Sequence, residues 1–238
     1  MRVVRSVLRF VFRGLFRILG RVKISGLENV PKTGAYLIAF NHVSLYDAPL
    51  VVAFWPTSPE VASASDIWQR KGQDYLVRWY HGIPVHRGEY DRNLIDTLTN
   101  ALSSGHPLVI APEGGRSHTP GMRPANPGVA YLAEKTGVPV LPVGVVGTTE
   151  DYLENALRAR RPTLEMRIGK PITLPSISEK GAARRAARQR NADLVMGYLA
   201  RLLPEEYRGC YADHELLSGD IPHDGKSLDN FGVLNGNS

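Results

Sequence analysis

The chain has 238 residues, of which 43% are hydrophobic and 22% are charged, so it can fold as one globular domain with a sizeable core. Its single cysteine, Cys210, excludes an internal disulfide framework and a multi-cysteine metal site. The net charge is +6, and residues 204–238 hold seven acids against two basic residues, so the positive charge belongs to the preceding part of the chain. The sequence contains neither the phosphate-binding loop of nucleotide-dependent enzymes nor the Gly-x-Ser-x-Gly motif of serine hydrolases.

The first 23 residues contain seven basic residues and no acid. Arginine recurs at every fourth position from Arg5 to Arg21, and mostly bulky apolar residues fill the positions between. This pattern predicts a basic amphipathic helix over residues 1–23 that lies on a membrane surface, with its arginines attracted by anionic lipid. The alternative is a helix that packs on the protein's own core and leaves its arginines in solvent. No apolar run approaches the roughly 20 residues that a membrane span requires, and no nucleic-acid-binding motif accompanies the charges.

Short apolar segments alternate with amphipathic segments from residue 35 onward. This order predicts an α/β fold with a mixed, largely parallel sheet flanked by helices. Strands are expected at residues 35–40, 61–64, 83–86, 107–111, 139–146 and 163–169. Helices are expected at residues 45–55, 66–80, 91–104, 127–136 and 178–203. We assign residues 24–210 to this domain and residues 211–238 to a polar, flexible tail.

Polar residues follow the first of these strands. Asn41 and His42 come directly after the apolar residues 35–40, and Asp47 lies five positions after His42. A carboxylate that binds one imidazole nitrogen leaves the other nitrogen to act as a base, so His42 and Asp47 are candidates for a catalytic pair that deprotonates a substrate hydroxyl. The simpler alternative is a capping box in which Asp47 closes the first turn of a helix.

Charged residues also follow the strand expected at residues 83–86. Arg87 comes directly after it, and a guanidinium at a strand end suits a phosphate or carboxylate group. A surface arginine paired with a nearby acid is the alternative.

The strand expected at residues 107–111 ends in a glycine-rich turn. Gly114 and Gly115 permit a close backbone approach, so their amides are candidates for contacts with an anion, and Arg116 adds a positive charge. Glu113 could accept from a substrate hydroxyl or brace an arginine such as Arg87. The alternative is a solvated turn without a ligand.

Residues 137–147 form an apolar run that contains two prolines. Each proline removes a backbone donor, so we expect this strand at an edge of the sheet or in the wall of an apolar channel. We interpret the run as structural.

These four clusters together resemble the glycerolipid acyltransferase family, whose best-known members acylate lysophosphatidic acid. The family's Asn-His-x-x-x-x-Asp block is present as Asn41, His42 and Asp47, and its Pro-Glu-Gly-Thr-Arg-Ser block is similar to residues 112–117. Residues 82–87 and 138–143 look like its second and fourth blocks, and the resemblance covers about residues 20–175. Gly115 stands where the family usually has threonine, which puts the acceptor selectivity in doubt.

The resemblance implies an O-acyltransferase that moves an acyl group from acyl-CoA or acyl-ACP (acyl carrier protein) to the free hydroxyl of 1-acylglycerol-3-phosphate, giving phosphatidic acid in phospholipid biosynthesis. It implies no metal and no cofactor besides this co-substrate. The partners would be a membrane lipid surface and a lysophospholipid acceptor, with no nucleic acid. The protein would lie at the cytoplasmic face of the cell membrane, peripheral or monotopic. Alternatives are acyl transfer to another lysophospholipid or an aminolipid, and non-catalytic peripheral lipid binding.

The resemblance also assigns roles to the residues of the four clusters. His42 would be the general base and Asp47 would hold it in place. The acceptor phosphate would be bound by Arg87, Arg116 and the amides around Gly114 and Gly115. Glu113 would bind the glycerol portion or order the site.

Overall fold

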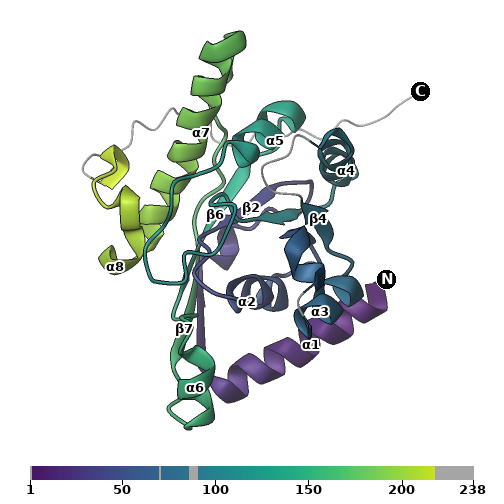
Figure 1. Ribbon diagram of the computed structural model, residues 1–238, viewed down its shortest axis with the longest axis vertical. Coiled ribbons are helices and arrows are strands. Elements are labelled where there is room, and N and C mark those ends of the chain that lie inside the picture. The colour runs from purple at the N-terminus through teal and green to yellow at the C-terminus, as the bar shows by residue number, and fades with distance from the viewer. Residues whose placement is uncertain (1, 70, 86–90, 218–238) are drawn as a thin grey trace.

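Seven strands form one mixed sheet in the order β1-β7-β6-β2-β5-β3-β4 within residues 2–69, 71–85 and 91–217, the part of the chain that the computed structural model describes (Figure 1). The strands are β1 (Arg21–Ser25), β2 (Leu37–Phe40), β3 (Glu60–Ala64), β4 (Ile83–Val85), β5 (Leu108–Ile110), β6 (Val140–Val146) and β7 (Thr163–Ile168). Neighbouring strands are parallel except for the pair β6 and β7, which is antiparallel. The predicted α/β fold with a mixed, largely parallel sheet is therefore confirmed.

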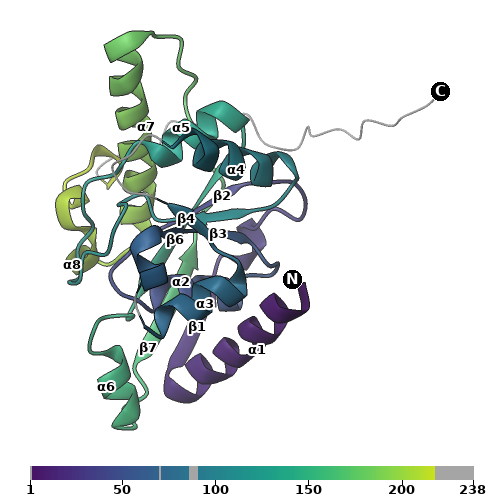
Figure 2. The same ribbon diagram turned by 45° about the vertical axis from the view of Figure 1, so that its right-hand side comes forward.

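Helices cover both faces of this sheet (Figures 1 and 2). They are α1 (Arg2–Leu19), α2 (Asp47–Phe54), α3 (Gln73–Tyr80), α4 (Arg92–Ser103), α5 (Gly128–Thr136), α6 (Tyr152–Leu157), α7 (Gly181–Leu202) and α8 (Glu205–Arg208). Helices α1, α2, α3 and α6 lie on one face, whereas α4, α5 and α7 lie on the other. The helix expected at residues 66–80 is divided into a 3-10 turn, Ser65–Gln69, and α3, because Gly72 between them has a left-handed φ of 87°.

Strand β2 runs through the centre of the sheet and contributes to both hydrophobic cores. Tyr36, Ile38 and Phe40 point into the core beneath α1 and α2, and Leu37 and Ala39 point into the core beneath α5 and α7. A strand that is buried on both faces needs apolar residues at every position, which explains its uninterrupted apolar sequence. This central strand delivers Asn41 and His42 at its carboxyl end.

Strand β6 is also internal, so the expectation of an edge position for the proline-rich run is wrong. It pairs with β2 on one side and with β7 on the other. Pro142 falls between the last pair of the β6–β7 ladder, Val143 with Ile168, and an isolated bridge from Val140 to Ile172. The missing proline amide therefore coincides with a break in the ladder, and no regular hydrogen bond is lost.

The amino-terminal helix is shorter than the predicted 1–23. Helix α1 ends at Leu19, and Arg21–Ser25 form the edge strand β1, which pairs in parallel with β7.

At the other end of the chain, Tyr211 is buried and its hydroxyl binds the Ala125 amide and the Asp193 carboxylate. The predicted tail thus begins inside the domain at residue 211, and residues 218–238 lie outside the described residues.

The arginines at positions 5, 9 and 13 of α1 face the protein, so the expectation that they contact anionic lipid is wrong. Arg5 is buried and makes two bonds of 2.5 and 2.7 Å to the carboxylate of Glu60. Arg9 and Arg13 donate to backbone carbonyls in and just after the last turn of α2, namely those of Val52, Ala53 and Trp55. Carbonyls at a helix carboxyl end lack partners within the helix and carry a partial negative charge, so they bind guanidinium groups favourably.

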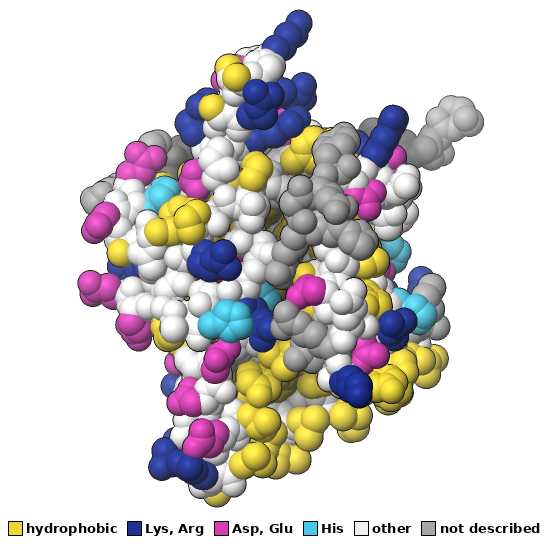
Figure 3. Space-filling view, in the orientation of Figure 1, with side chains coloured by type: hydrophobic (Ala, Val, Ile, Leu, Met, Phe, Trp, Pro, Cys, Tyr) yellow, Lys and Arg dark blue, Asp and Glu magenta, His cyan; other side chains and the backbone are white. Residues whose placement is uncertain are grey.

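The opposite side of α1 exposes a row of apolar side chains. Figure 3 shows hydrophobic side chains gathered along the lower edge of the molecule, where α1 lies. We call this row the apolar face of α1, and its members are Val3, Val4, Val7, Phe10, Val11, Leu15 and Ile18. Helix α3, which contacts α1, also exposes two aromatic side chains, Tyr75 and Trp79. Among the described residues, no helix has the length and apolar content that crossing a membrane requires.

Candidate active site

His42 and Asp47 meet at the carboxyl end of β2, where the chain turns into α2. The Nδ1 atom of His42 lies 2.9 Å from the Oδ2 atom of Asp47. The Asp47 side chain is fully buried, whereas the His42 side chain is 16% exposed. The Ser44 amide donates to the same Asp47 oxygen over 2.7 Å, which is one of the two bonds of the expected capping box. The Ser44 hydroxyl accepts from the Tyr46 amide over 3.1 Å, so the box is incomplete, and the carboxylate of Asp47 binds both the turn and the imidazole.

Asp47 has a further partner that the sequence analysis missed. The hydroxyl of Thr148, also fully buried, donates to Oδ1 of Asp47. Thr148 follows the end of β6 just as His42 follows the end of β2, and β6 and β2 are parallel neighbours. The available signal was that Thr148 is a polar residue just beyond a predicted strand. It was missed because residues 137–147 are apolar and were interpreted only as a structural strand.

Asn41 connects the same two strand ends. Its side-chain amide donates to the Val145 carbonyl over 2.9 Å, and its side-chain oxygen accepts from the Val145 amide over 2.7 Å. Asn41 is buried, so these two bonds satisfy polar groups that are inaccessible to water. They hold the carboxyl ends of β2 and β6 together behind His42.

Glu113 binds backbone amides of two loops, and its suggested partner Arg87 lies outside the described residues. One carboxylate oxygen accepts from the His42 amide over 2.7 Å, and the other accepts from the Arg123 amide over 2.8 Å. The residue is only 3% exposed, and this burial raises the pKa of Glu113 to about 7 against the opposing effect of the two amide bonds. Glu113 thus joins the loop of His42 to the loop of Arg123.

Gly114 is required by the turn that follows β5. Its φ is 68°, and a Cβ atom at this position would overlap the side-chain amide of Asn126. The Gly114 amide donates to the Ala111 carbonyl over 3.1 Å, so it closes the turn and does not point at an anion as expected. The neighbouring Gly115 is buried.

Arg116 lies beside the loop that carries His42. The amides of the next two residues, Ser117 and His118, donate to the carbonyls of His42 and Val43. The guanidinium of Arg123 donates to the Arg116 carbonyl over 3.2 Å, so a second arginine, missed in the sequence analysis, approaches the same loop. Arg87, the other predicted phosphate ligand, lies outside the described residues.

Among the described residues, no three His, Cys, Asp or Glu side chains come together in a group that could hold a metal ion. The His42 and Asp47 pair by itself offers two side-chain ligands, and the Nδ1 atom of His42 is already engaged with Asp47.

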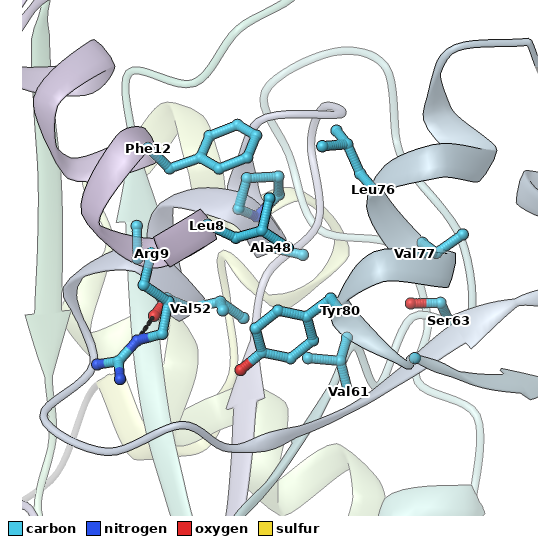
Figure 4. A pocket seen from close by; sticks show the side chains of 13 residues that line it. Leu8, Arg9, Phe12, Ala48, Val52, Val61, Ser63, Leu76, Val77 and Tyr80 are labelled. Carbon is cyan, nitrogen blue, oxygen red and sulfur yellow. Dashed lines mark hydrogen bonds between the residues drawn. The ribbon is translucent and has the colours of Figure 1, made fainter. Parts of the chain in front are cut away.

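An apolar cavity of about 100 Å³ lies between α1, α2 and α3 (Figure 4). Leu8 and Phe12 of α1 form one wall, and Leu76 and Val77 of α3 face them. Ala48, directly after Asp47 in α2, also lines the cavity. The cavity therefore extends from the helix with the exposed apolar face to the start of the helix that carries Asp47.

Comparison with known proteins agrees with this geometry. The acyltransferase family model matches residues 21–146, just over half of the chain. A 1-acyl-sn-glycerol-3-phosphate acyltransferase from Cocos nucifera is 29% identical over 164 residues, which cover 67% of this chain and 53% of that protein. A Bacillus subtilis protein of the same name is 24% identical over 76% of this chain and 91% of its own length. The chain spans about half the length of the first relatives that it matches, those from Cocos nucifera and Borreliella burgdorferi.

A solved structure has the same fold. The 1-acyl-sn-glycerophosphate (LPA) acyltransferase PlsC from Thermotoga maritima aligns with a TM-score of 0.58 at 22% identity, covering 80% of this chain and 78% of that chain. At this identity the likeness shows the fold alone. The family match extends from β1 to β6 and contains His42, Asp47 and Glu113 in the geometry described above. The resemblance found in the sequence is thus confirmed, and the chain belongs to the acyltransferase family.

Proposed function

We propose that this protein transfers an acyl group from an acyl thioester to the free hydroxyl of 1-acylglycerol-3-phosphate, giving phosphatidic acid. The observation that carries the proposal is the contact between His42 and the buried Asp47 at the end of β2, because lipid binding alone has no use for such a base. The names of the relatives from Cocos nucifera and Bacillus subtilis support the acceptor. The donor thioester, on coenzyme A or acyl carrier protein, is the part of the proposal that rests on the sequence resemblance.

The geometry suits a direct transfer to the acceptor oxygen. Because Asp47 binds Nδ1, the Nε2 atom of His42 takes the proton as the O–H bond of the acceptor breaks. The acceptor oxygen attacks the thioester carbonyl, and collapse of the tetrahedral intermediate breaks the C–S bond. The departing thiolate then takes the proton from Nε2, which restores neutral His42. The carboxylate of Asp47 stabilises the imidazolium between these steps.

The test uses a second histidine–carboxylate pair in the same molecule as its control. His118 contacts Glu150 over 2.5 Å, but both side chains are 56% exposed. We expect His42→Ala to abolish phosphatidic acid formation from lysophosphatidic acid and acyl-CoA or acyl-ACP, with its circular dichroism spectrum unchanged. We expect His118→Ala to retain activity.

Two results would reject parts of the proposal. Turnover by His42→Ala would remove His42 as the base. Inactivity of the wild type with this acceptor, together with activity on another lysophospholipid or an aminolipid, would keep the mechanism and replace the acceptor.

We further propose that the apolar cavity receives an acyl chain of a lipid substrate. Its walls are mostly aliphatic and aromatic, and its lining residue Ala48 neighbours Asp47 in sequence. Burial of methylene groups contributes about 0.8 kcal/mol each, so an apolar cavity of this kind favours a hydrocarbon over water. A chain bound there would place its carbonyl end near the start of α2.

The protein is proposed to bind the cytoplasmic face of the cell membrane through the apolar face of α1. In water this row of valine, leucine, isoleucine and phenylalanine side chains is exposed, and a lipid surface would bury it. Since Arg5, Arg9 and Arg13 bind protein groups, hydrophobic burial supplies most of the binding energy in this proposal, and the arginine stripe supplies little. The single cysteine agrees with a reducing compartment.

A further inference from the structure

Asp47 uses both of its oxygens, each with a different kind of partner. Oδ2 binds the Nδ1 atom of His42 and the Ser44 amide, at 2.9 and 2.7 Å. Oδ1 accepts from the hydroxyl of Thr148, which comes from 101 residues further along the chain. Both Asp47 and Thr148 are fully buried, so the hydroxyl provides a contact that water does not reach. Rotation of the carboxylate away from His42 would break this bond and leave Oδ1 without a donor.

The position of Thr148 is fixed by the sheet. Strand β6 ends at Val146, and Gly147 turns the chain with a left-handed φ of 87°. A Cβ atom at Gly147 would overlap the Thr163 carbonyl of β7, so the turn depends on glycine. The Gly147 amide donates to the hydroxyl of Tyr207 over 3.0 Å, which secures the turn from its other side. Thr148 therefore reaches Asp47 from a rigid strand end.

The geometry points to Thr148 as a positioning residue of the catalytic site, which holds the Asp47 carboxylate in the rotamer that binds Nδ1 of His42. This role rests on the proposed base function of His42. During transfer the imidazole becomes positively charged, and a carboxylate fixed at both oxygens meets that charge without reorientation. Because Thr148 is fully buried behind Asp47, its loss should lower the rate of the chemical step and leave substrate binding unchanged.

Three substitutions test this role. Thr148→Val keeps the shape of the side chain and removes the hydroxyl, whereas Thr148→Ser keeps the hydroxyl and removes the methyl group. Thr149→Val is the matched control, because the hydroxyl of this adjacent threonine binds Asp151 at the exposed start of α6. We expect Thr148→Val to lower kcat by about 10- to 100-fold, the effect of losing a hydrogen bond to a charged group, with both KM values within about twofold of wild type.

The two other variants and the folded fraction separate positioning from folding. We expect Thr148→Ser to restore kcat to within about threefold of wild type and Thr149→Val to match wild type. Loss of stability alone would lower kcat and the folded fraction together, whereas loss of positioning would lower kcat at an unchanged folded fraction.

A measurement without substrate distinguishes failure of this inference from failure of the proposed reaction. The proton between Nδ1 of His42 and Asp47 should give a downfield signal in the proton NMR spectrum that is absent in His42→Ala. We expect this signal in wild type, Thr148→Ser and Thr149→Val, and its loss or a clear shift in Thr148→Val. An unchanged signal in Thr148→Val, or an unchanged kcat in an enzyme that forms phosphatidic acid, would overturn the inference even if His42 is the base.

Discussion

Replacing Phe10 with alanine tests how α1 binds a lipid surface. The Phe10 side chain lies in the middle of the apolar face and is 78% exposed. Complete burial of such a side chain contributes about 1.5–3 kcal/mol, so the exposed part should contribute about 2 kcal/mol on transfer to a membrane. This corresponds to a decrease of about 30-fold in the membrane partition coefficient of Phe10→Ala.

The assay is sedimentation with vesicles of phosphatidylcholine and phosphatidylglycerol at low and high salt. Phe12→Ala is the matched control, since Phe12 lies on the same helix but lines the apolar cavity. We expect this control to lose stability and to retain membrane binding. High salt should lower the membrane partition coefficient of the wild type less than the Phe10→Ala substitution does, because Arg5, Arg9 and Arg13 are engaged with Glu60 and with α2. Equal partitioning of Phe10→Ala and wild type, or release of the wild type by salt alone, would refute this reasoning.

Three further predictions concern the site and the cavity. Native Glu113 keeps its proton up to about pH 7, whereas the unfolded chain loses this proton near the ordinary pKa of 4.5. The folded state is therefore favoured less as pH rises between these two values. The free energy of unfolding should fall by about 3 kcal/mol over this range. Urea denaturation at several pH values should show this dependence in the wild type and its loss in Glu113→Gln; identical slopes would contradict the burial effect. Steady-state kinetics of Arg116→Ala should show a raised KM for the acceptor and an unchanged KM for the thioester, and the reverse would remove Arg116 from the phosphate site. Val77→Phe fills part of the apolar cavity, so competition between thioesters should show a shift toward shorter chains, and an unaltered preference would place the acyl chain elsewhere.

Local patterns in the sequence predicted most of the sheet because its central strands are buried on both faces. Strands β2 and β6 are continuous apolar runs, and their predicted positions agree with the structure within two residues. Strand β1 was missed because it is an edge strand whose side chains alternate between exposed and half-buried positions. Its Arg21 and Lys23 therefore continued the basic pattern of the preceding helix.

The orientation of α1 could not be read from its own residues. Amphipathicity shows that a helix has two different faces, but the partner decides which of them turns inward. Here the partners of Arg9 and Arg13 are backbone carbonyls at the end of α2. Every residue has such a carbonyl, so the sequence does not show which ones bind an arginine. The predicted contact of the arginines with anionic lipid therefore placed Arg5, Arg9 and Arg13 on the wrong side of the helix.

The same limit applies to the candidate site. The spacing of His42 and Asp47 places both within one turn of the chain, so their contact was visible as a local pattern. The partner of Glu113 at His42 is 71 residues away, and Thr148 is 101 residues from Asp47. Such contacts depend on the order of strands in the sheet, and this order was not predicted.

The inward arginines of α1 change what an amino-terminal truncation of this protein would measure. Helix α2 is eight residues long, or about 12 Å, with Asp47 at one end and the carbonyls held by Arg9 and Arg13 at the other. Removing α1 would uncap α2, leave Glu60 without the guanidinium of Arg5, and open the core that contains the buried Phe16. A shortened protein that had lost activity would thus report damage to the helix that carries Asp47 as much as detachment from lipid. Point substitutions on the outer side of α1 separate these two effects, whereas deletion combines them.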